Sequence, residues 1–257
     1  MPPLPLCWTA LPAPTSEWAR LGGWTLPSGT QLLSILLLRA LLGFVFLLAI
    51  IAGVLFSSAG TLHDGRAWAG LAVFFGCAGI VSVWLWFHDK ALLERRVKAG
   101  PGAEADPIQN IVQALAGLVF LATFAVPGFD TRFGWSQVPL AVSVVGDAMI
   151  ADGFLIVFLT FRENTFTAGT IEIAEDQHVI ASGPYAIIRH PMYAGALIMI
   201  AGIPLALGSW FGLVPAALLV PVLVWRLMRE EVFLVAHLAG YGDYRDRVRY
   251  RLVPMFW

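Results

Sequence analysis

The densest group of chemically active side chains lies in residues 182–195, which read Ser-Gly-Pro-Tyr-Ala-Ile-Ile-Arg-His-Pro-Met-Tyr-Ala-Gly. An apolar run follows directly. Pro191 suits the first turn of a helix, because the N–H that proline lacks would have no partner there. Arg189 and His190 are therefore expected at the membrane–water boundary, beside backbone N–H groups without intrahelical acceptors. Such a helix start is a predicted site for an anionic group.

Two further groups of polar residues are expected to join this stretch. Arg226 and the adjacent pair Glu230 and Glu231 follow the last apolar run, and Arg226 and Glu230 are spaced to share one helix face. Alone, that spacing is typical of a surface ion pair. The second group lies on the loop that precedes residues 182–195 and consists of Gln177, His178, Val179 and Ile180. Residues 182–195 themselves add Tyr185 and Tyr193.

The rest of the chain must supply a membrane scaffold for these groups. Of its 257 residues, 58% are hydrophobic and 13% are charged, and the mean hydropathy is +0.77. Soluble domains carry roughly 25% charged residues, so this composition excludes a water-soluble core and predicts an integral membrane protein. The two cysteines are far apart and offer no metal spacing and no disulfide framework. The basic residues show no nucleic-acid footprint, so we expect neither a metal nor a nucleic-acid partner.

The apolar runs predict an all-α fold with about six membrane segments, the last two forming a helical hairpin. Pro127 and Gly128 are expected to end the third segment. The predicted segments are residues 32–56, 67–87, 108–126, 138–161, 192–207 and 211–226.

These segments divide the chain into three parts. Residues 1–30 form an N-terminal arm, residues 31–161 a four-helix membrane scaffold, and residues 162–257 a core that contains all three polar groups. The core opens with the longest polar loop, residues 162–190. Within that loop, residues 170–174 alternate apolar and polar side chains, which is typical of a strand.

The distribution of Lys and Arg predicts the orientation in the membrane. With both termini in the cytoplasm, six crossings place 13 of the 16 basic residues inside, two outside and one within a segment. This bias obeys the positive-inside rule. The three polar groups and the C-terminal tail would then share the cytoplasmic face of a multi-pass protein. A site built from them would open to the cytosol on one side and to the lipid bilayer on the other.

Three patterns follow one another through residues 162–257. They are Gly183-Pro-Tyr185-x-x-x-Arg189-His190-Pro191-x-Tyr193-x-Gly195, Arg226-x-x-x-Glu230-Glu231, and Gly240-Tyr241-x-x-Tyr244-x-x-x-Val248 with Leu252-Val-Pro254 after it. In order and spacing they resemble the signature of the isoprenylcysteine carboxyl methyltransferase-like family. Its members are integral membrane methyltransferases related to phospholipid N-methyltransferases. The first 160 residues carry no comparable signature.

The resemblance implies a function and a role for each residue. S-adenosyl-L-methionine would be bound, and S-adenosyl-L-homocysteine released, in a cleft at the cytoplasmic face. Glu230 and Glu231 would bind the amino group or ribose of the cofactor, and Arg226 would position an acceptor carboxylate, which makes Arg226 and Glu230 the predicted catalytic residues. The remaining predicted cofactor-binding residues are Gln177, His178, Val179, Ile180, Tyr185, Arg189, His190, Pro191 and Tyr193.

The acceptor is left open by the sequence. Methyl transfer from a sulfonium depends mainly on positioning. A carboxylate is already ionised at neutral pH, whereas an amine or thiol must lose a proton, which Tyr or Glu could assist. A prenylcysteine-type carboxylate arriving from the bilayer is the lead prediction, and a phospholipid amine or a small thiol is the alternative. A non-catalytic membrane protein or transporter of the same fold is a further alternative, favoured by two carboxylates deep in the fourth segment, Asp147 and Asp152.

Overall fold

The computed structural model describes residues 29–98, 107–167 and 176–257. Most of the predicted N-terminal arm and the predicted strand-like segment at residues 170–174 lie outside the described residues. The chain divides into two units, Met1–Arg39 and Ala40–Trp257. The second unit contains every residue of the site described below.

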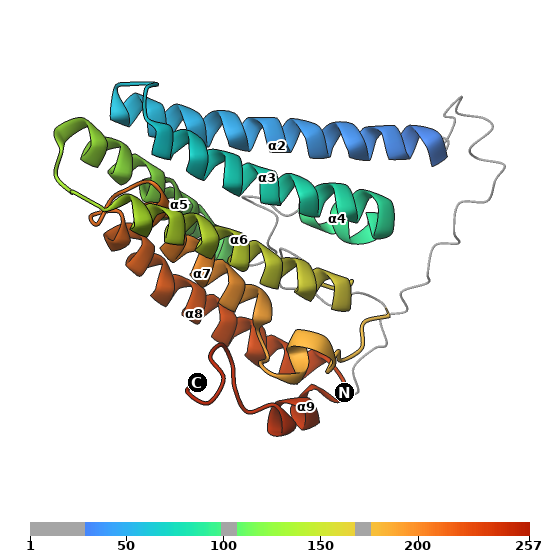
Figure 1. The fold of residues 1–257 in the computed structure, drawn as a ribbon. Coiled ribbons are helices and arrows are strands. Elements are labelled where there is room, and N and C mark those ends of the chain that lie inside the picture. The colour runs from blue at the N-terminus through green and yellow to red at the C-terminus, as the bar shows by residue number, and fades with distance from the viewer. Residues whose placement is uncertain (1–28, 99–106, 168–175) are drawn as a thin grey trace, which may run out of the picture. The chain divides into compact units, whose positions relative to one another are not determined.

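In the described residues the regular structure is entirely helical, as predicted (Figure 1). Within the described parts of the chain, four helices are long and apolar enough to cross a membrane. Another apolar helix, α7, has only 16 residues, and with α8 it forms the predicted hairpin. The elements are α2 (Gly29–Ala59), α3 (Gly65–His88), α4 (Lys90–Lys98), α5 (Pro107–Phe133), α6 (Leu140–Glu163), the 3-10 helix η1 (Gly183–Ala186), α7 (Pro191–Ala206), α8 (Leu213–His237) and α9 (Tyr241–Arg247).

The predicted end of the third segment is wrong, because α5 continues through Pro127 to Phe133. Both Pro127 and Gly128 are buried. A Cβ on Gly128 would lie 1.9 Å from the Ser58 hydroxyl oxygen and 2.6 Å from the Leu55 carbonyl oxygen, so glycine allows α5 to approach α2 closely. Neighbouring helices thus hold α5 together across a residue that cannot donate a backbone hydrogen bond.

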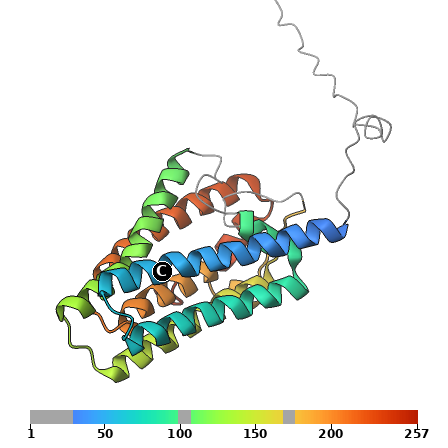
Figure 2. The same ribbon diagram turned by 90° about the horizontal axis from the view of Figure 1, so that it is seen from above.

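The main hydrophobic core lies between α3, α5, α6 and α7, with the second half of α2 beside them. α5 also packs against α8, and Figure 2 shows the two helices next to each other. Large buried side chains of this core include Ile51, Leu55, Phe74, Phe124, Ile150 and Ile203.

The most extensive helix pair is α6 with α7. Glycines at seven-residue spacing, Gly146 and Gly153 in α6 and Gly195 and Gly202 in α7, bring the two backbones into contact. A Cβ on Gly153 would lie 2.6 Å from the Gly195 carbonyl oxygen, and one on Gly195 would lie 2.7 Å from the Gly153 carbonyl oxygen. Close backbone approach at small residues is a common basis of helix association in membranes. This contact fixes the start of α7, where residues 189–193 lie.

We expect Gly153→Ala to lower the melting temperature of the detergent-purified protein. The added methyl group would meet backbone atoms of α7, and overpacking of this kind costs about 1–3 kcal/mol. Thermal unfolding followed by intrinsic fluorescence measures the effect. Gly76→Ala in α3 is the matched control, since a Cβ there meets nothing within 4 Å. Equal losses in the two variants would contradict the importance of this contact.

The elements that carry the predicted site gather at one end of the second unit. The end of α6, η1, the start of α7, the end of α8 and α9 lie together there (Figure 1). At the opposite end, the Asp130 carboxylate accepts hydrogen bonds from the backbone N–H and hydroxyl of Ser136, at 2.6 Å each, and from the Ser209 hydroxyl at 2.5 Å. This buried carboxylate joins the α5–α6 loop to the turn of the hairpin.

Candidate functional site

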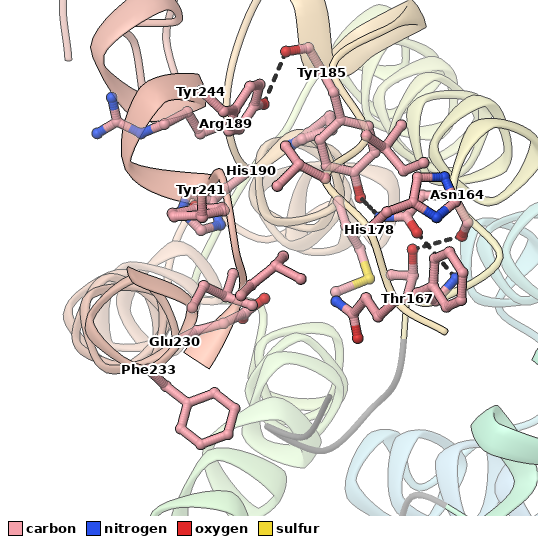
Figure 3. A pocket seen from close by; sticks show the side chains of 18 of the residues that line it. Asn164, Thr167, His178, Tyr185, Arg189, His190, Glu230, Phe233, Tyr241 and Tyr244 are labelled. Atoms are coloured by element: carbon pink, nitrogen blue, oxygen red, sulfur yellow. Dashed lines mark hydrogen bonds between the residues drawn. The ribbon is translucent and has the colours of Figure 1, made fainter. Parts of the chain in front are cut away.

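A pocket opens where α6 ends and α7 begins (Figure 3). It has about 790 Å³ of empty space, part of which is open solvent. Glu230 and Phe233 on α8 form one side, and Asn164, Thr167 and His178 form the other (Figure 3).

The three polar groups that are separate in the sequence meet at this pocket. Of the predicted site residues, Arg226 and Glu231 do not line it, although both neighbour Glu230 on α8. The predicted residues that line it are Gln177, His178, Val179, Ile180, Tyr185, Arg189, His190, Pro191, Tyr193 and Glu230.

The structure adds lining residues to which sequence reasoning assigned no role. Two of them, Tyr241 and Tyr244, belong to the C-terminal motif. Phe233 and Leu234 follow Glu230 on one face of α8, and Leu238 comes directly after the end of that helix. Helical spacing from Glu230 could have identified these three residues. The remaining ones, which carried no clear signal in the sequence, are Asn164, Phe166, Thr167 and Met192.

Tyr193 connects the two helices of the hairpin inside the site. Its hydroxyl donates to Oε2 of Glu230 at 2.7 Å, and the Arg226 side chain interacts with the same tyrosine. The His190 ring packs edge-on against the Tyr193 ring, with centroids 5.9 Å apart. Tyr193 and Glu230 are therefore in direct contact on the same side of the fold, as the predicted site requires.

Arg189 anchors the C-terminal tail to the start of α7. Its Nη1 donates to the carbonyl oxygens of Val248 at 2.8 Å and Arg249 at 3.1 Å. Its backbone N–H donates to the carbonyl oxygen of Tyr250 at 2.9 Å. The tail is thereby held against the site by a side chain that also lines the pocket.

Glu231 completes this anchor from α8. One of its carboxylate oxygens lies 2.7 Å from Nε of Arg189, and the other lies 2.8 Å from Nε of Arg251. The side chains of Arg189 and Glu231 are 4% and 7% exposed. The two adjacent glutamates of the motif thus have different surroundings, because Glu230 faces the pocket and Glu231 faces the tail.

Tyrosines form the wall nearest the tail. The Tyr244 hydroxyl donates to the carbonyl oxygen of Tyr185 at 2.8 Å (Figure 3), and Nδ2 of Asn164 donates to the Tyr185 hydroxyl at 3.0 Å. Burial raises the pKa of Tyr185 and Tyr244. Burial also raises the pKa of Tyr241, and the nearby carboxylates of α8 add to that effect. These phenols are therefore neutral hydrogen-bond donors at physiological pH.

Two buried polar atoms of pocket-lining residues have neither a hydrogen-bond partner nor an ion-pair partner within the described part of the chain. They are Nε2 of His190 and the hydroxyl oxygen of Tyr241. Buried polar groups are usually paired, and an unpaired one costs free energy.

The surroundings of His190 predict a pH dependence of stability. The pKa of His190 is lowered to about 4, mainly because the ring is buried. The nearby Glu231 carboxylate opposes this shift. The ring in the unfolded chain titrates near 6.5, so between those values the unfolded state binds more protons. Stability should therefore be complete above pH 6.5 and should fall as the pH drops towards 4.

This dependence can be measured as the melting temperature of the detergent-purified protein between pH 7 and pH 4.5. We expect His190→Gln to flatten the decline relative to the unaltered protein. His237→Gln, at an exposed histidine of α8, should leave the decline unchanged. If the His190→Gln variant declined as steeply as the unaltered protein, His190 would not be the group responsible.

The two carboxylates of α6 lie apart from the pocket. Asp152 is exposed and Asp147 is half-buried, and neither lines the pocket. One Asp147 oxygen is buried without a hydrogen-bond partner among the described residues. The pocket and these carboxylates are separate features of the fold.

Comparison with known protein families adds a separate line of evidence. Residues 141–240 match the family model described as phospholipid methyltransferase. A search of curated proteins found no significant match to the chain. The matched region begins in α6 and ends just before α9, so it includes all of α7 and α8 and most of the pocket lining. This match confirms the resemblance that the sequence motifs show, because the phospholipid methyltransferase family consists of integral membrane methyltransferases related to the isoprenylcysteine carboxyl methyltransferases.

Proposed function

We propose that this membrane methyltransferase uses S-adenosylmethionine and methylates an amphipathic acceptor that arrives from the bilayer. The observation that carries the proposal is the pocket at the start of α7, where Tyr193 and Glu230 are in contact and ten predicted residues converge. The phospholipid methyltransferase match covers η1, α7 and α8, which carry most of the residues that line this pocket.

The pocket is chemically suited to the cofactor, which would supply a methyl group on a sulfonium when bound. The Glu230 carboxylate can accept hydrogen bonds from a cationic amino group or from ribose hydroxyls. Nε2 of His190 and the hydroxyl of Tyr241 offer polar contacts that no described residue takes. Apolar side chains such as Val179 and Leu234 can pack on the faces of the adenine ring.

The residues around the reacting groups act mainly by positioning. Tyr193 holds the Glu230 carboxylate in one orientation at 2.7 Å, and orientation is the main contribution a protein can make to an in-line displacement. We assign Arg226, beside Tyr193, to the acceptor. Glu231 is assigned a positioning role through Arg189, because its two oxygens are already engaged by arginines.

The acceptor that we place first is a prenylcysteine-type carboxylate, which Arg226 could hold by a charge-assisted hydrogen bond. A phospholipid amine is the second candidate, favoured by the family that matches residues 141–240. A small thiol is a further alternative. We also propose that the pocket and both termini face the cytoplasm, following the positive-inside bias of the chain.

Transfer of a radiolabelled methyl group from S-adenosylmethionine tests the proposed function. The purified protein would be given a farnesylcysteine analogue, phosphatidylethanolamine and a small thiol in separate reactions. We expect label in one amphipathic acceptor, and release of labelled methanol by base would identify a methyl ester. Absence of transfer to these acceptors and to extracted membrane lipids would contradict the proposal.

A further inference from the structure

A guanidinium from outside the matched region reaches the site. Arg96 lies on α4, before residues 141–240 and outside the sequence motifs. Its Nη1 lies 3.8 Å from Sδ of Met192, and its guanidinium carbon lies 5.1 Å from the centre of the Phe161 ring. Met192 lines the pocket next to Tyr193. Arg96 is thus directed at the start of α7 and not at open solvent.

This position brings two arginines to the same tyrosine. Burial lowers the pKa of Arg96, Tyr193 opposes the shift, and the charge of Arg226 contributes to it. Arg226 in turn interacts with Tyr193. A guanidinium remains charged at neutral pH even after such a shift. Two like charges in partly buried surroundings repel each other, so an acceptor that brings a further anionic group to these arginines would be attracted by both.

Tyr193 therefore has charged neighbours of both signs. Glu230 accepts the hydrogen bond of the Tyr193 hydroxyl and faces the pocket assigned to the cofactor, whose amino group and sulfonium are cationic. Arg96 and Arg226 supply positive charge close to the same residue. The neighbouring Arg95 is not part of this arrangement, because its guanidinium donates to the carbonyl oxygen of Thr165.

We propose that Arg96 and Arg226 form an oxyanion subsite that binds the anionic group of the methyl acceptor, a carboxylate or a phosphate attached to an apolar chain. This inference rests on the proposed function and narrows its acceptor class. Guanidinium groups suit both anions, because their donors match two oxygens at once. A prenylcysteine-type carboxylate would react at the bound group, whereas a phospholipid would be held by its phosphate while its amine accepts the methyl group.

The test measures binding as well as catalysis. Dodecanoate and dodecyl phosphate serve as anionic probes, and dodecyltrimethylammonium as a cationic one, each titrated into protein in a neutral maltoside detergent. We expect Arg96→Gln and Arg226→Gln to weaken anion binding about tenfold or more, as for loss of a charge-assisted hydrogen bond. Cation binding should not weaken. Whichever of dodecanoate and dodecyl phosphate binds with the higher affinity shows whether the subsite prefers a carboxylate or a phosphate.

Two controls make the outcome decisive. Lys98→Gln removes a charge from the same helix, where Lys98 is exposed and paired with Glu94, and it should leave anion binding within about twofold. The affinity of Arg96→Gln for S-adenosylhomocysteine should also be unchanged. Anion binding that is equal in the unaltered protein and Arg96→Gln, or reduced to the same degree in Lys98→Gln, overturns the inference. Anion binding that depends on Arg96 in a protein that binds no S-adenosylhomocysteine supports the subsite and overturns the proposed function.

Discussion

Glu230→Gln is expected to weaken the binding of S-adenosylhomocysteine about 100-fold, because a charge-assisted hydrogen bond in the pocket is lost. Glutamine has the same shape as glutamate and can still accept the hydrogen bond from the Tyr193 hydroxyl. The substitution therefore removes the charge and preserves the packing of α7 against α8. Methyl transfer should fall at least as much as binding. Isothermal titration of the detergent-purified protein gives the affinity.

The matched control for this experiment is Asp246→Asn on α9. It removes one negative charge near the pocket end of the chain, but the Asp246 side chain is 75% exposed. Its affinity for S-adenosylhomocysteine should equal that of the unaltered protein. If Glu230→Gln bound S-adenosylhomocysteine as tightly as this control, the assignment of Glu230 to the cofactor would be wrong.

Glu231→Ala is expected to cause the largest loss of stability among single changes at the site. It would leave the buried guanidinium of Arg189 without its carboxylate, and breaking a buried pair in this way costs about 3–5 kcal/mol. The Arg189 side chain also holds the carbonyl oxygens of Val248 and Arg249. Loss of Glu231 should therefore loosen the C-terminal tail. The melting temperature and the rate of proteolysis within residues 241–257 measure the two effects.

Glu94→Ala, which breaks an exposed ion pair, is the control for the loss of stability expected in Glu231→Ala. Glu94 pairs with Lys98 at 2.7 Å, but the two side chains are 52% and 64% exposed, and exposed pairs contribute about 0–1 kcal/mol. The melting temperature of this variant should stay close to that of the unaltered protein. A Glu231→Ala protein as stable and as protease-resistant as Glu94→Ala would show that the buried ion pair does not anchor the tail.

Much of the fold could be predicted from the sequence because membrane helices are encoded locally. The first, second and fourth predicted segments differ from α2, α3 and α6 by only a few residues at each end. The end of α5 could not be predicted, since its continuation through Pro127 depends on tertiary contact of Gly128 with Leu55 and Ser58. The glycine contact between α6 and α7 could not be predicted either, because each helix carries only half of the pattern and the contact depends on how the two helices pack.

The site could be predicted in part, because its motifs follow one another in a specific order. That order indicates which segments meet, but it does not show which side chain faces the pocket. Glu230 and Glu231 are adjacent, and successive residues on a helix point in directions about 100° apart. Only the position of the tail shows that Glu231 pairs with Arg189 and Arg251. Arg96 lies outside every motif, so sequence patterns alone could not associate it with Tyr193.

Hydrogen–deuterium exchange with and without S-adenosylhomocysteine tests the cofactor pocket most directly. Binding at the start of α7 should slow exchange in residues 177–193 and 230–244, which include most of the pocket lining. Residues 60–64 and 134–139, at the opposite end of the second unit (Figure 1), should exchange at unchanged rates. Protection confined to that opposite end, or no protection of residues 177–193 and 230–244 at saturating ligand, would contradict the account.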